Sequence, residues 1–135
     1  MTYHLQIVTP DGLYFDGQAE RLIVPTVEGP VAILARHINY VTALGMGPAK
    51  VVTEQGERTA ACIGGMVAVT GSETKVVATT FEWADEIDTE RAQASLEKAQ
   101  ALLAKPDLDK QTQQAAQARL KRAQVRLSVA NQAKK

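Results

Sequence analysis

The sequence predicts an α+β protein, in which an N-terminal β-sandwich of about ten strands precedes a C-terminal antiparallel hairpin of two helices. Three observations support this prediction. Short segments rich in β-branched residues alternate with turn residues about every ten positions up to Thr80. Apolar residues then recur at spacings of three and four from Ala92 to Ala130, which is a helical period. Pro106 interrupts that second pattern and divides it into two helices.

The first strand is expected over residues 2–9, where side chains alternate between two faces. A turn at residues 10–12 follows, because Pro10 fixes φ and Gly12 permits a positive φ. A short strand at 13–15 and a second turn at Asp16-Gly17 come next. Further strands are expected over residues 18–25, 31–34, 40–44, 49–53, 58–63, 66–70 and 75–80.

The stretch from residue 82 to residue 92 joins the two patterns. Asp88 is expected to cap the first helix, because its carboxylate can accept the free backbone N–H groups of the first turn. Ile87 and Ala92 occupy the positions of a small hydrophobic staple. The sequence therefore predicts a β-sandwich domain of residues 1–84 and a helical hairpin domain of residues 85–135.

The two helices present stripes of alternating alanine and leucine. Asp107 or Asp109 is expected to cap the second helix. Small alanine side chains bury little area, so at roughly 25 cal/mol per Å² the seam between the helices is expected to be marginal. The stripes are Ala92, Leu96, Ala99 and Leu103 in the first helix, and Ala116, Leu120, Ala123, Leu127 and Ala130 in the second.

Charge is balanced overall but uneven along the chain. Fifteen basic residues match fifteen acidic ones, which gives no indication of a nucleic-acid partner. From Lys110 to Lys135, however, seven residues are basic and none is acidic. This segment is interpreted either as a contact for an acidic partner or as a solvated helix face.

The remaining composition argues for a binding or structural protein. Cys62 is the single cysteine, so no intrachain disulfide can form, and His4 and His37 are isolated in sequence. Gly64-Gly65 lacks the lysine of a phosphate-binding loop. The N-terminus has no signal-peptide pattern, and no apolar run approaches the ~18 residues that a membrane span needs. A soluble, cytoplasmic protein without catalytic activity is expected.

Several segments, taken in order, resemble the epsilon subunit of bacterial F-type ATP synthase. Residues 87–92, Ile-Asp-Thr-Glu-Arg-Ala, are similar to that family's nucleotide-binding signature Ile/Leu-Asp-x-x-Arg-Ala. The other segments are residues 2–12, Glu28-Gly29 followed by Ile33 and His37, residues 63–66 followed by Val69, and residues 122–130. Together they span nearly the whole chain.

The resemblance implies a non-catalytic subunit of the central rotor. The sandwich would contact the gamma subunit and the membrane ring of c subunits, at the cytoplasmic face of the bacterial membrane. The hairpin would either fold onto the sandwich or extend along gamma to the catalytic beta subunit and block ATP hydrolysis. In some members ATP binds the folded hairpin, so ATP is a possible regulatory ligand here. No cofactor is required, and a role for Mg²⁺ stays open.

The resemblance also implies two sets of site residues. Lys98 stands where ATP-binding relatives carry an arginine, and lysine lacks the bidentate fork that suits phosphate, so weaker ATP binding is expected. The loop at residues 28–37 also departs from the family pattern: it lacks two glycines and a proline, and it gains Pro30. The nucleotide-binding residues would be Glu82, Ile87, Asp88, Arg91, Ala92, Lys98, Arg122 and Arg126. The partner contacts would be Glu28, His37, Arg119 and Lys121.

Each of these roles has a structural alternative. Asp88 can be a helix cap that binds no ligand. Arg91 can form a surface ion pair with a neighbouring carboxylate, which contributes well under ~1 kcal/mol to stability. Glu82 can be an exposed residue at the end of a strand. Arg122 and Arg126 share a helix face, which can hold phosphates, meet acidic residues of the beta subunit, or be solvated. For the whole chain, the alternative is a stand-alone sandwich adaptor whose helical tail binds an acidic protein.

Overall fold

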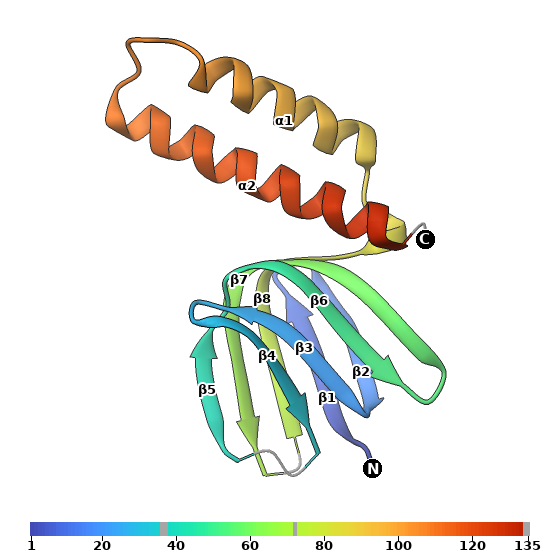
Figure 1. Cartoon of the computed structure of the whole chain (residues 1–135). Helices are drawn as coiled ribbons and strands as arrows, with labels where there is room; N and C mark the ends of the chain where they lie inside the picture. Colours follow the sequence, from blue (N-terminus) through green and yellow to red (C-terminus); the bar gives the residue numbers. More distant parts are fainter. Residues whose placement is uncertain (36–37, 72, 134–135) are drawn as a thin grey trace. The chain divides into compact units, whose positions relative to one another are not determined.

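The computed structural model describes residues 1–35, 38–71 and 73–133. The chain forms two compact units, Met1–Trp83 and Ala84–Lys135. The first unit consists of strands and the second of helices (Figure 1).

Eight strands make up the first unit in the described part of the chain. They form one hydrogen-bonded sheet in the order β2-β1-β8-β7-β6-β3-β4, and β5 pairs with β7 off this path. The pair β1–β8 is parallel, and the other pairs are antiparallel. The strands are β1 (Tyr3–Thr9), β2 (Gly12–Ala19), β3 (Arg21–Thr26), β4 (Gly29–Leu34), β5 (Tyr40–Ala43), β6 (Met46–Thr53), β7 (Gly56–Thr70) and β8 (Glu73–Trp83).

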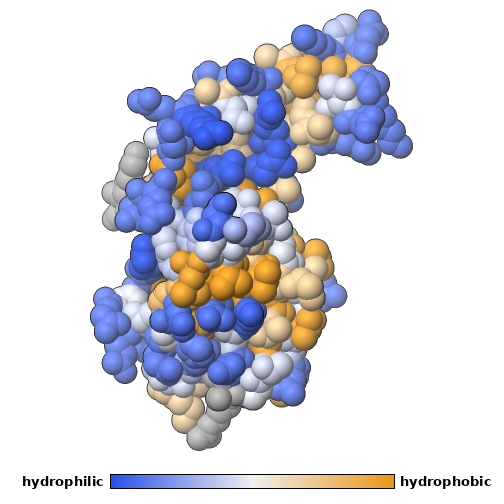
Figure 2. Space-filling view, turned by 180° about the vertical axis from the view of Figure 1, so that it is seen from behind, coloured by the Kyte–Doolittle hydropathy of each residue, from blue (hydrophilic) through white to orange (hydrophobic). Residues whose placement is uncertain are grey.

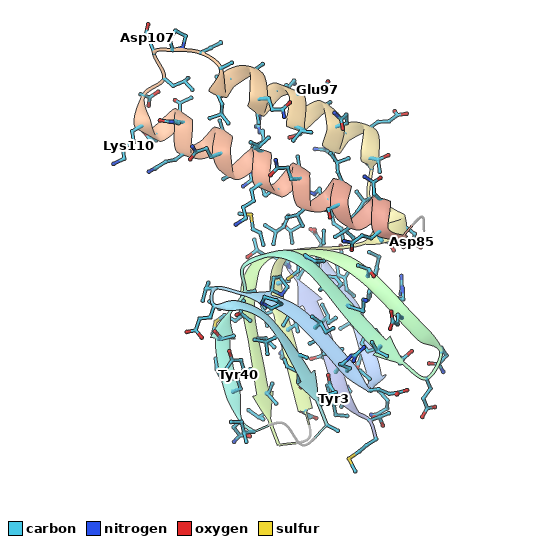
Figure 3. The ribbon with its side chains drawn as sticks, in the orientation of Figure 1. Tyr3, Tyr40, Asp85, Glu97, Asp107 and Lys110 are labelled. Atoms are coloured by element: carbon cyan, nitrogen blue, oxygen red, sulfur yellow. The ribbon has the colours of Figure 1, made fainter. Side chains whose placement is uncertain are left out.

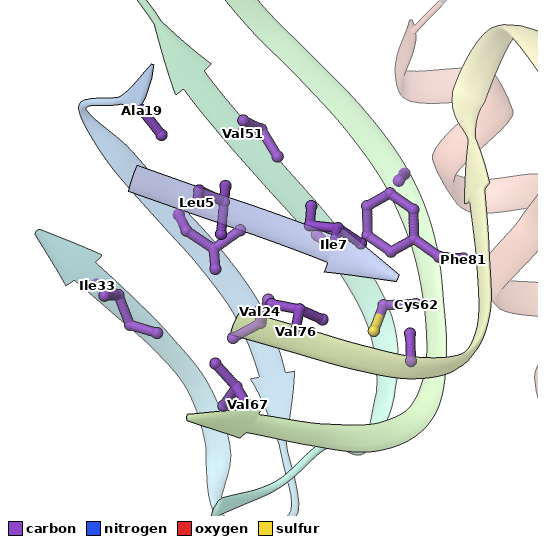
Figure 4. Close-up of a cluster of buried hydrophobic side chains, with 14 of the residues drawn as sticks. Leu5, Ile7, Ala19, Val24, Ile33, Val51, Cys62, Val67, Val76 and Phe81 are labelled. Atoms are coloured by element: carbon purple, nitrogen blue, oxygen red, sulfur yellow. The ribbon is translucent and has the colours of Figure 1, made fainter. Parts of the chain in front are cut away.

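The sheet folds over into two layers because β7 and β8 are long and bent (Figures 1 and 4). One half of β7 pairs with β6, and the other half pairs with β5. The bend lies at Gly64-Gly65, where both residues have positive φ and the β7–β8 pairing skips a position. A Cβ on Gly65 would lie 2.1 Å from the carbonyl oxygen of Val77, so only glycine allows this close approach. The predicted strands 58–63 and 66–70 are therefore one strand, and fewer strands result than the ten expected.

The predicted turn at Asp16-Gly17 is part of a strand. Asp16 and Gly17 pair with β1, so β2 continues to Ala19 and the next strand begins at Arg21. Pro30 lies in β4 opposite Pro25. Proline is tolerated there because β4 is an edge strand of the sheet.

The core of the first unit lies between the two layers (Figure 4). It takes large side chains from four strands, among them Leu5, Ile33, Val67 and Phe81, which are almost completely buried. The Tyr3 hydroxyl also donates a hydrogen bond of 2.7 Å to the Ile33 carbonyl oxygen. Since β1 and β4 are not neighbours in the sheet, this bond joins its two layers.

The second unit contains a short 3₁₀ turn, η1 (Ala84–Glu86), and the helices α1 (Thr89–Leu103) and α2 (Lys110–Ala133). The predicted cap at Asp88 is confirmed, because Oδ1 accepts the backbone N–H of Arg91 at 3.1 Å. For α2, Asp109 is the capping residue and accepts the backbone N–H of Thr112 at 3.3 Å. Figure 3 shows Asp107 in the connection between the helices, and α1 ends before Pro106.

The helices pack through alanines. Leu96 and Leu103 of α1 and Leu120 and Leu127 of α2 are only half-buried. The buried alanines of the seam are Ala92, Ala99, Ala116, Ala123 and Ala130.

In the described part of the chain, no helix is long and apolar enough to span a bilayer.

Candidate functional site

The start of α1 carries the nucleotide-binding signature suggested by sequence. Ile87 and Ala92 are buried, whereas Asp88 and Arg91 are exposed. Arg91 contributes its backbone N–H to the cap. Its guanidinium forms no salt bridge with Asp88 or Glu90 in the described residues. The surface pairing considered for Arg91 is therefore not present, and its charge is available to an anion.

Several basic residues of the hairpin share one face of each helix. On α1, Arg91 and Lys98 are seven residues apart, which is close to two helical turns. On α2, Arg119, Arg122 and Arg126 are spaced three and four apart, which also places them on one face. Arg122 and Arg126 are half-buried, and Arg119 is exposed.

A hollow of about 370 Å³ shows that these faces border the same side of the hairpin. Leu102 and Ala99 line it from α1, and Arg119 and Arg122 line it from α2. Leu102 lies four residues after Lys98, so the α1 face that carries Lys98 and Arg91 flanks the same groove. The other lining residues are Gln111, Thr112, Ala115 and Ala116.

The carboxylates of α1 lie on the other side. A second hollow, of about 430 Å³, is lined by Glu90 and Glu97 of α1 and by Leu127 of α2. Glu97 is labelled in Figure 3. Arg119 and Arg122 thus line one hollow, and Glu90 and Glu97 line the other. The hollow lined by the arginines suits a phosphate-bearing anion, and its lining contains no base that could activate water.

The other predicted residues are not part of the lining of this hollow. Glu82 is half-buried on β8 in the first unit, opposite Ala61. Glu28 is exposed in the turn between β3 and β4, and its backbone N–H donates to Thr26 Oγ1 at 3.2 Å. Lys121 is exposed on α2 and lines neither hollow. His37 lies outside the described residues.

The sandwich also carries an apolar hollow that sequence reasoning missed. It measures about 620 Å³ and lies on the outer face of β1, β7 and β8, where Met66 and Val77 are 52 % and 48 % exposed. Figure 2 shows hydrophobic atoms gathered on one face of the sandwich. Strand alternation could have placed Val8 and Val77 outward, but strand pairing was needed to bring them together. The lining residues are Val8, Thr9, Pro10, Gly65, Met66, Ala68, Lys75, Val77, Ala78 and Thr79.

A second missed cluster surrounds His4, which is isolated only in sequence. Its Nε2 lies 2.5 Å from Asp16 Oδ1 of β2, and its Nδ1 lies 3.5 Å from Glu73 Oε1 of β8. Hydrogen bonds with the two carboxylates raise the pKa of His4 above its ordinary value, and the bond with Asp16 contributes more than the bond with Glu73. The cluster joins three neighbouring strands at the surface of the sandwich.

The single thiol is not a nucleophile candidate. Cys62 is completely buried in the sandwich core. Burial raises the pKa of the Cys62 thiol to about 12, because the thiolate would lose its hydration. Among the described residues, no group of three or more His, Cys, Asp or Glu side chains is arranged so that it could hold a metal ion.

Comparison with known families covers both units. Residues 2–84 match the family described as ATP synthase, Delta/Epsilon chain, beta-sandwich domain. Residues 85–131 match ATP synthase, Delta/Epsilon chain, long alpha-helix domain. The two matches together span nearly the whole chain.

Individual proteins agree with these matches. The chain is 38% identical over 129 residues to the ATP synthase epsilon chain of Shouchella clausii, covering 96% of this chain and 95% of that one. The fold resembles a chain of the Euglena gracilis mitochondrial ATP synthase (OSCP/F1/c-ring), with a TM-score of 0.80 at 23% identity, over 93% of this chain and 79% of that one. It also resembles a chain of the Tetrahymena thermophila mitochondrial ATP synthase central stalk/c-ring, with a TM-score of 0.66 at 19% identity, over 94% and 95% of the chains.

Proposed function

The chain belongs to the family of ATP synthase delta/epsilon chains, whose members are non-catalytic subunits of the complex, and we propose that it works in the central stalk of an F-type ATP synthase. In this proposal the sandwich couples the gamma subunit to the c-ring, and the hairpin regulates ATP hydrolysis. The observation that carries the proposal is the family match over both units. The likeness of fold to a chain from a central stalk and c-ring assembly supports it.

The outer face of the sandwich is suited to a partner subunit. Exposed apolar patches of this kind mark interaction sites, because water contact with them is unfavourable. The proposal places the chain peripherally at the cytoplasmic face of the bacterial membrane, held through gamma and the c-ring. Co-purification with the gamma subunit tests it. Recovery of the chain without gamma would favour the stand-alone adaptor instead.

The hairpin is proposed to inhibit hydrolysis when it leaves its folded form. Its seam of small alanines buries little area, so opening costs little free energy. The basic residues of α2 then meet acidic residues of the catalytic beta subunit, with the exposed Arg119 and Lys121 among the contacts. Deleting residues 88–135 should leave assembly intact and raise ATP hydrolysis by the complex. An unchanged hydrolysis rate in the truncated complex would remove the inhibitory role.

ATP is proposed to bind the folded hairpin and hold it closed. Asp88 and Arg91 come from α1 and Arg122 and Arg126 from α2, so a ligand that contacts all four requires the helices to be packed. Binding then stabilises the folded form by RT ln(1 + [ATP]/Kd), which is ~2.7 kcal/mol at about a hundred times Kd. High ATP would therefore prevent inhibition, and low ATP would permit it.

Thermal unfolding of the isolated chain with and without ATP tests this step. The Asp88→Ala/Arg91→Ala double variant should lose the ATP-dependent rise in melting temperature. Because Asp88 is also a cap, the double substitution should lower the free energy of unfolding by about 1 kcal/mol without ligand. The ATP-dependent rise in melting temperature must therefore be compared within each variant. An unchanged rise in the double variant would place the nucleotide elsewhere. No rise in the wild type would leave Asp88 as a cap only.

A further inference from the structure

The outer face of β4, β3 and β6 is a second surface of the sandwich, separate from the apolar hollow on β1, β7 and β8 (Figure 1). Arg21 begins β3, and the next residue, Leu22, is completely buried in the core. Because side chains alternate along a strand, Arg21 lies on the outer face. Strand pairing places Leu34 of β4 and Val52 of β6 directly beside it. Leu34, Arg21 and Val52 therefore form a row across three strands.

The side chain of Arg21 carries a polar atom whose bonding is not satisfied. Its Nε is buried and has no hydrogen-bond partner within the described residues. Arg21 also forms no salt bridge in this part of the chain. Removing a donor of a charged group from water without giving it an acceptor is unfavourable. An acceptor supplied from outside the chain would therefore stabilise this arrangement.

The carboxylates close to this row in strand pairing or sequence do not supply that acceptor. Glu57 of β7 is paired with Val52 and continues the row, but its Oε2 lies 3.5 Å from Lys50 Nζ. Glu20, the residue before Arg21, forms no salt bridge among the described residues. Lys50 and Glu57 thus compensate each other, whereas the charge of Arg21 is not compensated.

The neighbours of Arg21 determine which kind of acceptor fits. Leu34 is 53 % exposed, and Val52 and Ile23 are half-buried on the same face. Aliphatic groups beside a guanidinium reduce its contact with water, which strengthens pairing with an opposite charge. A guanidinium is suited to a carboxylate, with which it can form two parallel hydrogen bonds. The complementary surface is therefore a carboxylate next to an apolar side chain.

We propose that this face is a docking surface for an acidic segment of a partner protein. A carboxylate of the segment pairs with Arg21, and an aliphatic side chain beside that carboxylate covers Leu34. A small anion could satisfy the guanidinium but would leave Leu34 in water. A second copy of the chain would present the same row, in which Glu57 is already paired with Lys50. The surface depends neither on the proposed gamma contact nor on the hairpin.

Titration of the isotope-labelled full chain with a blocked hexapeptide of alternating leucine and glutamate, followed by NMR, tests the proposal. The Nε–H resonance of Arg21 and the backbone amide resonances of Leu34 and Val52 should shift in a saturable way. A peptide with glutamine in place of glutamate should bind about tenfold more weakly, because it cannot form the charged pair. Equal affinity for the two peptides, or no saturable shift with the acidic peptide, would overturn the proposal.

Three variants of the chain separate the proposed contacts from a general effect of charge. Arg21→Gln should weaken binding of the acidic peptide about tenfold, with unchanged circular dichroism. Leu34→Ser should weaken it by a smaller factor, because only the apolar contact is lost. Lys105→Gln removes one positive charge from the exposed connection between the helices and should bind like the wild type. An equal loss in Lys105→Gln, or an unchanged affinity in Leu34→Ser, would contradict a specific surface.

Two further measurements examine the other possible occupants of the face. Sodium acetate at the same carboxylate concentration should shift the Arg21 resonance less than the peptide does. An equal shift would mean that the site binds small anions, which would overturn a docking surface. Dilution of the wild type without peptide should leave the resonances of Leu34 and Val52 unchanged. Shifts that depend on protein concentration would assign the face to a second copy and overturn the proposed partner.

Discussion

The sandwich and the hairpin are held together in contrasting ways. The sandwich buries large side chains such as Leu5, Ile33 and Phe81 between layers that are joined by strands distant in sequence. The hairpin buries mainly alanines between two helices that follow each other directly. Full burial of a large apolar side chain contributes about 1.5–3 kcal/mol, and an alanine contributes much less. The sandwich is therefore expected to be the more stable of the two units.

The largest difference in stability between the sandwich and the hairpin is expected when the two units are produced as separate chains. A chain of residues 1–84 should unfold cooperatively with β-rich circular dichroism, because its core is complete without the helices. A peptide of residues 85–135 should show low helicity at the same temperature, because the alanine seam is marginal. A disordered 1–84 chain, or a fully helical 85–135 peptide, would contradict the contrast.

A core truncation should be more costly in the sandwich than in the hairpin. Phe81 is 1 % exposed and makes edge contacts with Tyr14 and Trp83, at ring-centroid distances of 6.0 and 5.1 Å. Phe81→Ala should lower the free energy of unfolding of the sandwich by about 3–5 kcal/mol. Leu120→Ala in the half-buried seam should cost the hairpin about 1–2 kcal/mol. Urea titration followed by circular dichroism measures both, and equal losses would argue against the contrast.

A smaller but position-specific effect is expected at the bend of β7. Gly65→Ala places a Cβ 2.1 Å from Val77 O at a φ of +117°, so it should destabilise the sandwich by about 2 kcal/mol or more. Gly56→Ala is the matched control, because its φ is +124° and no atom lies within 4 Å of the added Cβ. Gly56→Ala should lower the free energy of unfolding by about 1 kcal/mol, because of backbone strain alone. Similar losses in both variants would mean that the close approach at Gly65 is unimportant.

The smallest effects should appear as different pH dependences of the two units. The pKa of His4 is raised above 6.5, so its stabilisation of the sandwich is complete below pH 6.5 and is lost as the pH rises through the folded pKa. The pKa of Asp109 is lowered below 3.8 by its hydrogen bonds with Thr112, so its contribution to α2 is present above pH 3.8 and is lost as the pH falls.

Two conservative variants test this pH difference. His4→Gln should flatten the decline in sandwich stability between pH 6 and 9, measured by urea titration of residues 1–84. Asp109→Asn should reduce the acid-induced loss of helicity measured by circular dichroism. If His4→Gln leaves the slope above pH 6.5 unchanged, the contacts with Asp16 and Glu73 do not stabilise the sandwich.

The sequence by itself determined the features that depend on local physics. The helical period after residue 88, the cap at Asp88 and the end of α1 before Pro106 each follow from a few neighbouring residues, and the structure confirms them. The ordered motifs also determined the family. The hairpin carries its charges at helical spacings, so the shared face of Arg122 and Arg126 could be predicted as well.

Only the tertiary structure decided the features that depend on contacts distant in sequence. Gly64-Gly65 permits both a turn and a bend, and the pairing of β7 with β8 shows that the strand continues. His4 meets Asp16 and Glu73 only because β1 lies between β2 and β8. Whether Arg119 faces a groove or solvent depends on how α1 packs on α2, because a helix pattern defines a face but not its neighbour. Contacts between residues distant in sequence therefore set the strand count, the His4 cluster and the hollow lined by Arg119 and Arg122.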